Sequence, residues 1–376
     1  MRDRYRRAFG VLDNQKLIVV SSTWWSRSLF GSWPNLFRQL MAELPVDRYR
    51  VAGILHPNLW HGHSPLQIRL WLADCLRAGL MLVPPVEGWG AALIAADVVI
   101  GDHGAVTCYA TTLDKPILLA SFPDDDVAAG SCVDLMGAMA PRLDRRRPLR
   151  RQVEEATNEF TPGRYGQVAD LITSAPGEAA VRLREVCYRL MDLSEPDGDP
   201  QVPVLTVDRL ASATGSGAAR VSAILAAGEI TDAGDVSLRR HSADAMRDRP
   251  LPAEPALDDP HLLAHAEHPT RSLRSTAGII FCYQEDLAME PVGWLAETLP
   301  SYPACLLAAV VTDSGDCLIR TRDGVELRLE VDALDPLCAA SAVYLWLTSP
   351  NGRDELPPLL RIDVGDGPRT VRGHRA

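Results

Sequence analysis

The sequence predicts an α/β protein, with a doubly wound parallel sheet followed by a smaller C-terminal α+β domain. In the first half, short apolar runs alternate with segments whose apolar residues recur at helical spacing. The runs are apolar throughout, which is typical of parallel strands covered by helices on both faces. After about residue 276 the pattern changes to that of strands and hairpins.

The first half contains five predicted strands with four helices between them. The strands are expected at 17–20, 51–55, 80–83, 98–100 and 117–120. The helices are expected at 34–44, 65–78, 89–96 and 106–113. In the first of these helices, Leu36, Leu40 and Leu44 fall on one face. This alternation predicts a Rossmann-like domain.

A chain of 376 residues is long enough for two or three domains, at about 150 residues each. The predicted division is an α/β domain with trailing helices over 1–193, a linker with a partly ordered helical or charged segment over 194–270, and a small α+β domain over 271–376. In the last domain, strands are expected at 278–283, 305–311, 317–322, 326–331 and 359–364, and a helix at 335–347. No catalytic motif is found there.

The composition excludes several classes of protein. The 38 Lys and Arg against 49 Asp and Glu give a net charge of −11, and no dense basic stripe is present to bind nucleic acid or an anionic membrane. No apolar run approaches the roughly 18 residues of a transmembrane helix, and the Arg-rich start lacks the apolar core of a signal peptide. The eight cysteines form no C-x-x-C pair, which favours reduced thiols in the cytoplasm. Lysine occurs only at Lys16 and Lys115, which points to GC-rich, bacterial coding.

Polar residues follow three of the predicted strands. They are Ser21–Thr23 after the first strand, His56 and Asn58 after the second, and Asp102–Gly104 after the fourth. Ligands of open parallel sheets bind beyond the carboxyl ends of the strands. The last group also precedes a predicted helix, whose free amides and dipole would suit a phosphate. A structural interpretation stays open, because Ser and Thr cap helices, His-Pro is common in turns, and Asp102 can cap the helix after it.

Four stretches taken in order resemble a known family. They are His56-Pro57-Asn58, Gly88-Trp89, the run from Ala96 to Val106, and the run from Leu113 to Leu118. This set is similar to the C-terminal, nucleotide-binding half of GT-B enzymes, in the form found in CDP-glycerol glycerophosphotransferases and UDP-N-acetylglucosamine 2-epimerases. The resemblance covers roughly residues 15–175.

The resemblance implies a role for residues at each strand end. His56 corresponds to a histidine linked to catalysis or phosphate contact. The backbone amides of the turn at Gly104, Ala105 and Val106 would hold the donor diphosphate. The resulting set of expected donor or phosphate-binding residues is Ser22, Thr23, Asn58, Asp102, His103, Gly104, Ala105, Val106 and Thr107.

The sequence departs from the family in two places. The stretch Thr107–Ala110 holds no carboxylate for the donor ribose, and the paired glutamates of the epimerases have no counterpart. GT-B enzymes also place an acceptor-binding domain before the donor half, and this chain begins almost directly at the donor half. Three explanations stay open: a truncated product, a partner chain that supplies the second wall, or a domain that no longer catalyses transfer.

Other signals are set aside. The spacing of His56, His61 and His63 matches no standard metal site, so no metal is expected, and His261, His265 and His268 are expected in a solvated, partly ordered segment. The chain has no P-loop and no G-x-S-x-G elbow, which disfavours a P-loop NTPase and an α/β-hydrolase. No dinucleotide fingerprint follows the first strand, which argues against NAD or FAD, so no cofactor is expected. Trp24 and Trp25 follow the first strand, where they could stack on a base or face the other domain.

Two hypotheses follow from the sequence. The first is a GT-B-like glycosyl- or glycerophosphotransferase domain that binds a nucleotide-activated small-molecule donor, such as CDP-glycerol or a nucleotide sugar. The alternative is a non-catalytic binding or scaffold protein that retains the donor-domain fold.

Overall fold

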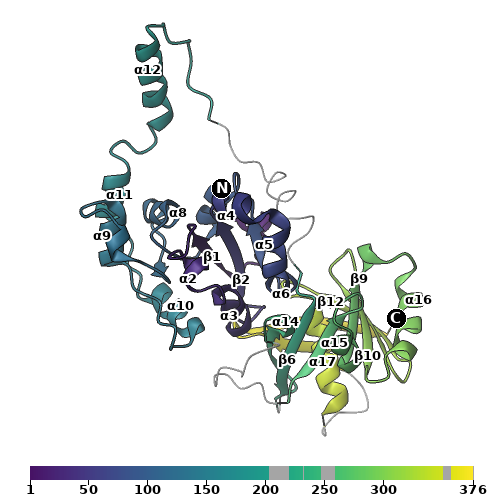
Figure 1. Ribbon diagram of the computed structural model, residues 1–376. Helices are drawn as coiled ribbons and strands as arrows, with labels where there is room; N and C mark the ends of the chain where they lie inside the picture. The colour runs from purple at the N-terminus through teal and green to yellow at the C-terminus, as the bar shows by residue number, and fades with distance from the viewer. Residues whose placement is uncertain (203–219, 232, 247–258, 350–356, 376) are drawn as a thin grey trace.

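The structure is a computed structural model that describes residues 1–202, 220–231, 233–246, 259–349 and 357–375 (Figure 1). It contains an open α/β domain followed by a β-barrel. Within these ranges, no helix combines the length and the apolar character that crossing a bilayer requires.

The α/β domain is built on a five-stranded sheet. Its strands are β1 (Lys16–Ser22), β2 (Tyr49–Leu55), β3 (Met81–Val83), β4 (Val98–Gly101) and β5 (Ile117–Leu119). All neighbours are parallel, in the order β3-β2-β1-β4-β5. The prediction of a doubly wound, Rossmann-like sheet is therefore confirmed, and the strand order reverses between β1 and β4.

Helices cover both faces of this sheet. On one face lie α2 (Leu29–Ser32), α3 (Leu36–Glu43), α4 (Pro57–His63), α5 (Pro65–Trp71), α6 (Ala73–Arg77) and α10 (Leu149–Asn158). On the other lie α1 (Arg2–Ala8), α7 (Trp89–Ala95), α8 (Ala105–Tyr109), α9 (Cys132–Met139) and α11 (Gly166–Ile172). Along β1, Ile18 and Val20 point into the first layer, and Leu17 and Val19 into the second, all fully buried. Both faces of the sheet are covered by helices, which explains why residues 17–20 of this strand are all apolar.

Three further elements complete this half of the chain. They are the 3₁₀ turns η1 (Ala110–Leu113) and η2 (Asp124–Asp126), and α12 (Ala179–Met191). Figure 1 shows α12 projecting away from the rest of the protein, and none of its residues is buried.

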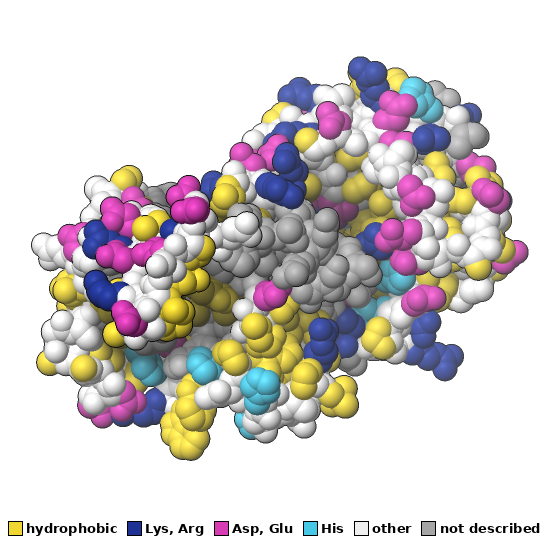
Figure 2. Space-filling model, turned by 90° about the horizontal axis from the view of Figure 1, so that it is seen from above, with side chains coloured by type: hydrophobic (Ala, Val, Ile, Leu, Met, Phe, Trp, Pro, Cys, Tyr) yellow, Lys and Arg dark blue, Asp and Glu magenta, His cyan; other side chains and the backbone are white. Residues whose placement is uncertain are grey.

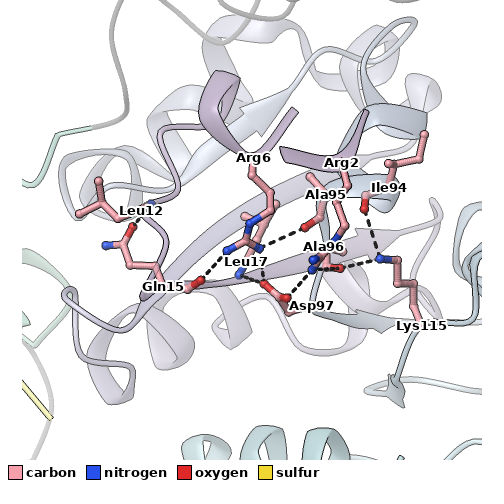
Figure 3. A network of polar contacts seen from close by, with 10 residues as sticks. All are labelled: Arg2, Arg6, Leu12, Gln15, Leu17, Ile94, Ala95, Ala96, Asp97 and Lys115. Atoms are coloured by element: carbon pink, nitrogen blue, oxygen red, sulfur yellow. Dashed lines mark hydrogen bonds and ion pairs between the residues drawn. The ribbon is translucent and has the colours of Figure 1, made fainter. Parts of the chain in front are cut away.

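A polar network fastens the amino end of the sheet (Figure 3). The Asp97 carboxylate accepts hydrogen bonds from the Leu17 amide at 2.7 Å and from the guanidinium group of Arg6 at 2.6 Å. Arg2 forms a further ion pair with the same carboxylate. Lys115 donates to the carbonyl of Ala96 at 2.9 Å at the end of α7, and burial lowers the pKa of Lys115. This lysine, which belongs to one of the stretches that carry the family resemblance, therefore lies at the opposite end of the sheet from the predicted site.

The second half forms a closed barrel. Its strands are β6 (Ala223–Ile230), β7 (Val236–Ser242), β8 (His261–His265), β9 (Ile279–Tyr283), β10 (Leu307–Val311), β11 (Cys317–Thr321), β12 (Glu326–Val331), β13 (Leu359–Asp363) and β14 (Pro368–Arg375). Their order around the barrel is β10-β11-β12-β14-β13-β7-β6-β8-β9. The pairs β8–β9, β9–β10 and β13–β7 are parallel, and the other pairs are antiparallel. The associated helices are α14 (Ala243–Met246), α15 (Arg271–Thr276), the 3₁₀ turn η3 (Gln284–Asp286), α16 (Pro291–Ser301) and α17 (Leu337–Thr348).

Helix α17 supplies much of the barrel core. It contacts strands on several sides of the barrel, including β6, β7, β10 and β13. Residues from all around the helix are buried, from Leu337 to Val343, and they join the inward side chains of the strands in one cluster. A helix that is apolar on every side fits such an enclosed position.

The predicted small α+β domain is wrong in its architecture and its extent. The expected strands at 278–283, 305–311, 317–322, 326–331 and 359–364 are present as β9 to β13, but they belong to a barrel. The segment expected as linker contributes β6, β7 and β8, although its parts 203–219 and 247–258 lie outside the described residues. His261 and His268 are buried rather than solvated. The final strand β14 was not predicted.

Two buried polar clusters join the barrel to the α/β domain. In the first, Arg240 on β7 is completely buried and donates to Asp47, which precedes β2, at 3.0 Å and to Asp335 at 2.8 Å. In the second, the buried Asp244 lies 3.0 Å from Arg77 of the α/β domain and 3.1 Å from the ring of His268. Each cluster contains charges from both halves and is centred on a group that is shielded from water, Arg240 in the first and Asp244 in the second. These contacts hold the two halves in one arrangement.

Candidate functional site

The candidate site lies at the carboxyl edge of the sheet, where the strand order reverses between β1 and β4. The turn after β1 and the turn after β4 touch there. A Cβ placed on Gly104 would lie 3.1 Å from the Cβ of Thr23. The turn after β2 adjoins them, because the amide of His56 donates to the carbonyl of Ser22 at 3.0 Å. The residues predicted after three separate strands therefore lie together.

Asp102 organises the two central turns. Its carboxylate is fully buried and accepts hydrogen bonds from the amides of Leu29 at 2.8 Å, Thr23 at 2.9 Å and Gly104 at 3.0 Å. The hydroxyl of Ser22 lies 3.4 Å away. Burial raises the pKa of the Asp102 carboxyl, while the three amides favour its ionised form and act against that shift. The side chain thus ties the loop after β1 to the turn after β4.

The start of α8 offers backbone amides that have no acceptor among the described residues. The first amides of a helix have no intrahelical acceptor, and Gly104 at the N-cap has no side chain to provide one. Ala105 is exposed and Val106 is half-buried, so this end of α8 faces outward at the sheet edge. These are the amides to which the family resemblance assigns the donor diphosphate.

Two predicted side chains near this turn have a polar atom without a partner. Thr107 is fully buried against Gly101, where a Cβ would lie 2.1 Å from the threonine hydroxyl. Within the described part of the chain, neither the Thr107 hydroxyl nor the Nδ1 atom of the half-buried His103 has a hydrogen-bond partner. Thr107 therefore packs behind the turn, and His103 lies edge-on to Phe122 with ring centroids 6.4 Å apart.

His56 is both a helix cap and a candidate acid. Its Nδ1 accepts the amide hydrogen of Asn58 at 3.1 Å at the start of α4, with Pro57 in the first turn. In a neutral ring this bond places the proton on Nε2. Trp24 stacks on the imidazole at 6.2 Å between centroids, and Asn58 is exposed beside it. The ring is thus oriented from two sides and is half-exposed.

Several residues near the site were not identified as site residues from the sequence. Ser28 caps α2 and donates to the carbonyl of Trp25 at 2.7 Å, which shapes the loop after β1. Phe30 and Trp71 line a cavity next to that loop. The concentration of tryptophan in the first 90 residues was the available signal for this aromatic cluster. Among the described residues, no group of three or more His, Cys, Asp or Glu side chains is arranged to hold a metal ion.

Comparisons with known proteins give only a loose likeness. No family model matches the chain, and no curated protein matches it. Among solved structures, the wall teichoic acid polymerase TagF soaked with CDPG aligns with 51% of this chain and 46% of its own, at 13% identity and a TM-score of 0.34. A glycosyltransferase from Rickettsia africae ESF-5 aligns with 51% of this chain and 52% of its own, at 8% identity and a TM-score of 0.33. The chain thus spans about half the length of these solved chains, and the likeness does not define a reaction.

Proposed function

We propose that the carboxyl edge of the sheet binds a nucleotide-activated small-molecule donor for a GT-B-type glycosyl or glycerophosphoryl transfer. The observation that carries the proposal is the meeting of three polar strand ends beside the uncapped start of α8, at the reversal point between β1 and β4. Backbone amides and a helix dipole stabilise a leaving diphosphate without a metal ion.

Five of the predicted residues have a defined role in this proposal. The amides of Ala105 and Val106 bind the diphosphate, and Thr23 lines the same turn. His56 donates the proton on Nε2 to the donor or holds a phosphate oxygen, because its Nδ1 is already occupied. Asp102 positions the loops instead of touching the donor, since its carboxylate is buried among the chain's own amides.

One observation favours the alternative, a non-catalytic binding or scaffold protein. The amides of Thr23 and Gly104 are directed at Asp102, so two donors that could meet a phosphate are already used. A site with fewer free donors would bind an anion more weakly.

Ligand binding distinguishes the two functions. We would measure thermal shifts and calorimetric titrations of the full chain with CDP-glycerol, CMP, UDP-sugars and UDP. At about 100 times Kd, a ligand adds about 2.7 kcal/mol to the free energy of unfolding, which should raise the melting temperature by about 5–10 °C. The His56→Ala variant should reduce this shift, and His61→Ala, on the same helix, should not. No shift with any nucleotide would contradict the donor-site proposal.

A further inference from the structure

A cavity of about 610 Å³ lies beside the loop that follows β1. It is bounded by that loop, by α2 and by helices α4 and α5, next to the edge where the donor is proposed to bind. Figure 2 shows hydrophobic side chains and histidines gathered around a hollow on this side of the protein. Its volume falls in the range of cavities that hold small organic ligands, about 300–1,000 Å³.

Rings dominate the lining of this cavity. Trp24, Trp25, Phe30, His63 and Trp71 all face it. The other described residues of the lining are small or polar, apart from one leucine, and none of them is acidic or a lysine or arginine. A cavity for a hydrocarbon chain would instead be lined by branched aliphatic side chains, and a cavity for a phosphate would carry cations. Ring edges and faces favour contact with another aromatic ring.

The rings lie at angles that leave a space between them. The Trp24 and Trp25 rings meet edge-to-face at 77° with centroids 5.3 Å apart. Trp71 packs against Phe30 at 6.2 Å and against His63 at 4.9 Å. The tryptophans are nevertheless exposed, Trp25 by 71% and Trp71 by 46%. Exposed tryptophans that are held by neighbours but not covered by them are available to a ligand.

The loop holds Trp25 in an unfavourable conformation. Its φ of 89° lies in the left-handed region, which bulky residues rarely adopt. The carbonyl of Trp25 is fixed by the amide and the hydroxyl of Ser28, at 3.2 and 2.7 Å. Arg27 pairs with Asp126 at 2.6 Å, and Asp102 binds the amide of Leu29 at the end of the loop. Strain that is maintained in this way is characteristic of ligand-binding loops.

We infer that this cavity binds an uncharged aromatic ring system, packed among Trp24, Trp25 and Trp71. The polar groups at its wall, Asn58 and Ser26, allow a single hydrogen-bonding substituent on the ring. This site goes beyond the proposed donor site, because its described lining contains no charged Lys, Arg, Asp or Glu side chain and shares only Asn58 with the expected donor residues, and its occupancy does not depend on a nucleotide.

The uncharged fluorescent amine N-phenyl-1-naphthylamine tests the inference with the full chain. Its fluorescence should rise and saturate as it binds, and the tryptophan emission should fall. Trp25→Ala and Trp71→Ala should each raise the Kd by about tenfold or more. Both side chains are exposed, so these variants should melt near the temperature of the unchanged chain.

A blocking variant and a matched control complete the experiment. A Cβ at Gly62, which lines the cavity, meets no atom within 4 Å, so Gly62→Trp can fill the space without displacing the backbone. It should abolish saturable binding. Tyr188→Ala removes an aromatic ring from α12, far from the cavity, and should leave the Kd unchanged.

Three results would overturn the inference. Binding that persists in Gly62→Trp would place the probe elsewhere on the protein. Displacement of the probe by farnesol at equal concentration would show that the cavity takes a hydrocarbon chain. Displacement by CMP or UMP would assign the rings to the base of a nucleotide donor. The CDP-glycerol and UDP titrations test the proposed donor site separately from this inference, because those nucleotides can fail to bind while the aromatic probe still does.

Discussion

Replacing Asp102 by Asn tests whether this carboxylate organises the site. The change keeps the size of the side chain but replaces one acceptor oxygen with an NH2 group. One carboxylate oxygen accepts the amides of Leu29 at 2.8 Å and Thr23 at 2.9 Å, and the other accepts the amide of Gly104 at 3.0 Å. Whichever way the new amide is oriented, at least one backbone N–H loses its acceptor.

The expected cost follows from this geometry. In the better orientation the amide of Gly104 is left unpaired, which costs about 1–3 kcal/mol. The remaining bonds also change from charge-assisted to neutral, and the loss is partly offset because a buried charge is removed. We expect Asp102→Asn to lower the free energy of unfolding by about 2–3 kcal/mol, and Asp102→Ala to lower it further because all three amides lose their partner.

Tryptophan fluorescence during urea unfolding measures the free energy of unfolding of the α/β domain, which contains Asp102. Six of the eight tryptophans lie in the first 90 residues, so the emission follows the α/β domain. The exposed Asp13→Asn serves as the matched control and should leave the urea midpoint unchanged. An ordinary surface substitution changes the free energy of unfolding by no more than about 0.5 kcal/mol. If Asp102→Asn changes it by no more than this, Asp102 does not hold the loops. Loss of nucleotide binding at unchanged stability would instead make it a direct ligand contact.

Three further predictions concern other parts of the protein. Arg240→Met should lower the free energy of unfolding in urea by roughly 3–5 kcal/mol, because Asp47 stays buried without its partner. Adding Asp47→Leu should recover most of this loss, and a double variant as unstable as Arg240→Met alone would refute the pairing. Gly90→Ala should raise the free energy of unfolding by up to about 1 kcal/mol, measured as a higher melting temperature, because a Cβ there meets nothing within 4 Å. Gly101→Ala should lower the melting temperature, since its Cβ would lie 2.1 Å from the buried hydroxyl of Thr107. Burial lowers the pKa of His241 from 6.5 to about 4, so as the pH falls the imidazole is protonated in the unfolded chain before it is protonated in the folded one. The stability that the neutral ring provides above pH 6.5 should be lost as the pH falls towards 4. A urea midpoint that does not change over this pH range would contradict this prediction.

The α/β half could be predicted from the sequence because its signals are local. Each strand is buried on both faces, so a continuous apolar run such as 17–20 is sufficient evidence for it. The polar strand ends were found for the same reason, since parallel strands bring their carboxyl ends to one edge. The bonds that shape the site were not predicted, because Asp102 and Leu29 lie 73 residues apart.

The barrel could not be predicted because its signals are long-range. Strand β6 is rich in alanine and ends near a glycine, a composition that disfavours a strand on local grounds. Strand β8 begins and ends with histidine and follows a proline, so it resembles a solvated loop, yet His261 is buried and stacked on Tyr344 at 4.3 Å. Strand β6 pairs with the next strand, β7, and with the more distant β8, while β8 pairs with β6 and β9. These pairings override the composition of both strands.

The position of α17 along the chain determines when the barrel can form during synthesis. The ribosome releases β6 to β12 before α17, so the inward side chains of these strands emerge before the helix that they pack against. Closure then requires β13, close to the end of the chain, to pair with β7, which emerged more than a hundred residues earlier. Such distant pairing makes folding slow and leaves strand edges unpaired in the meantime. Removing even the last two strands should leave the barrel open, because β7 and β12 would lose their partners β13 and β14.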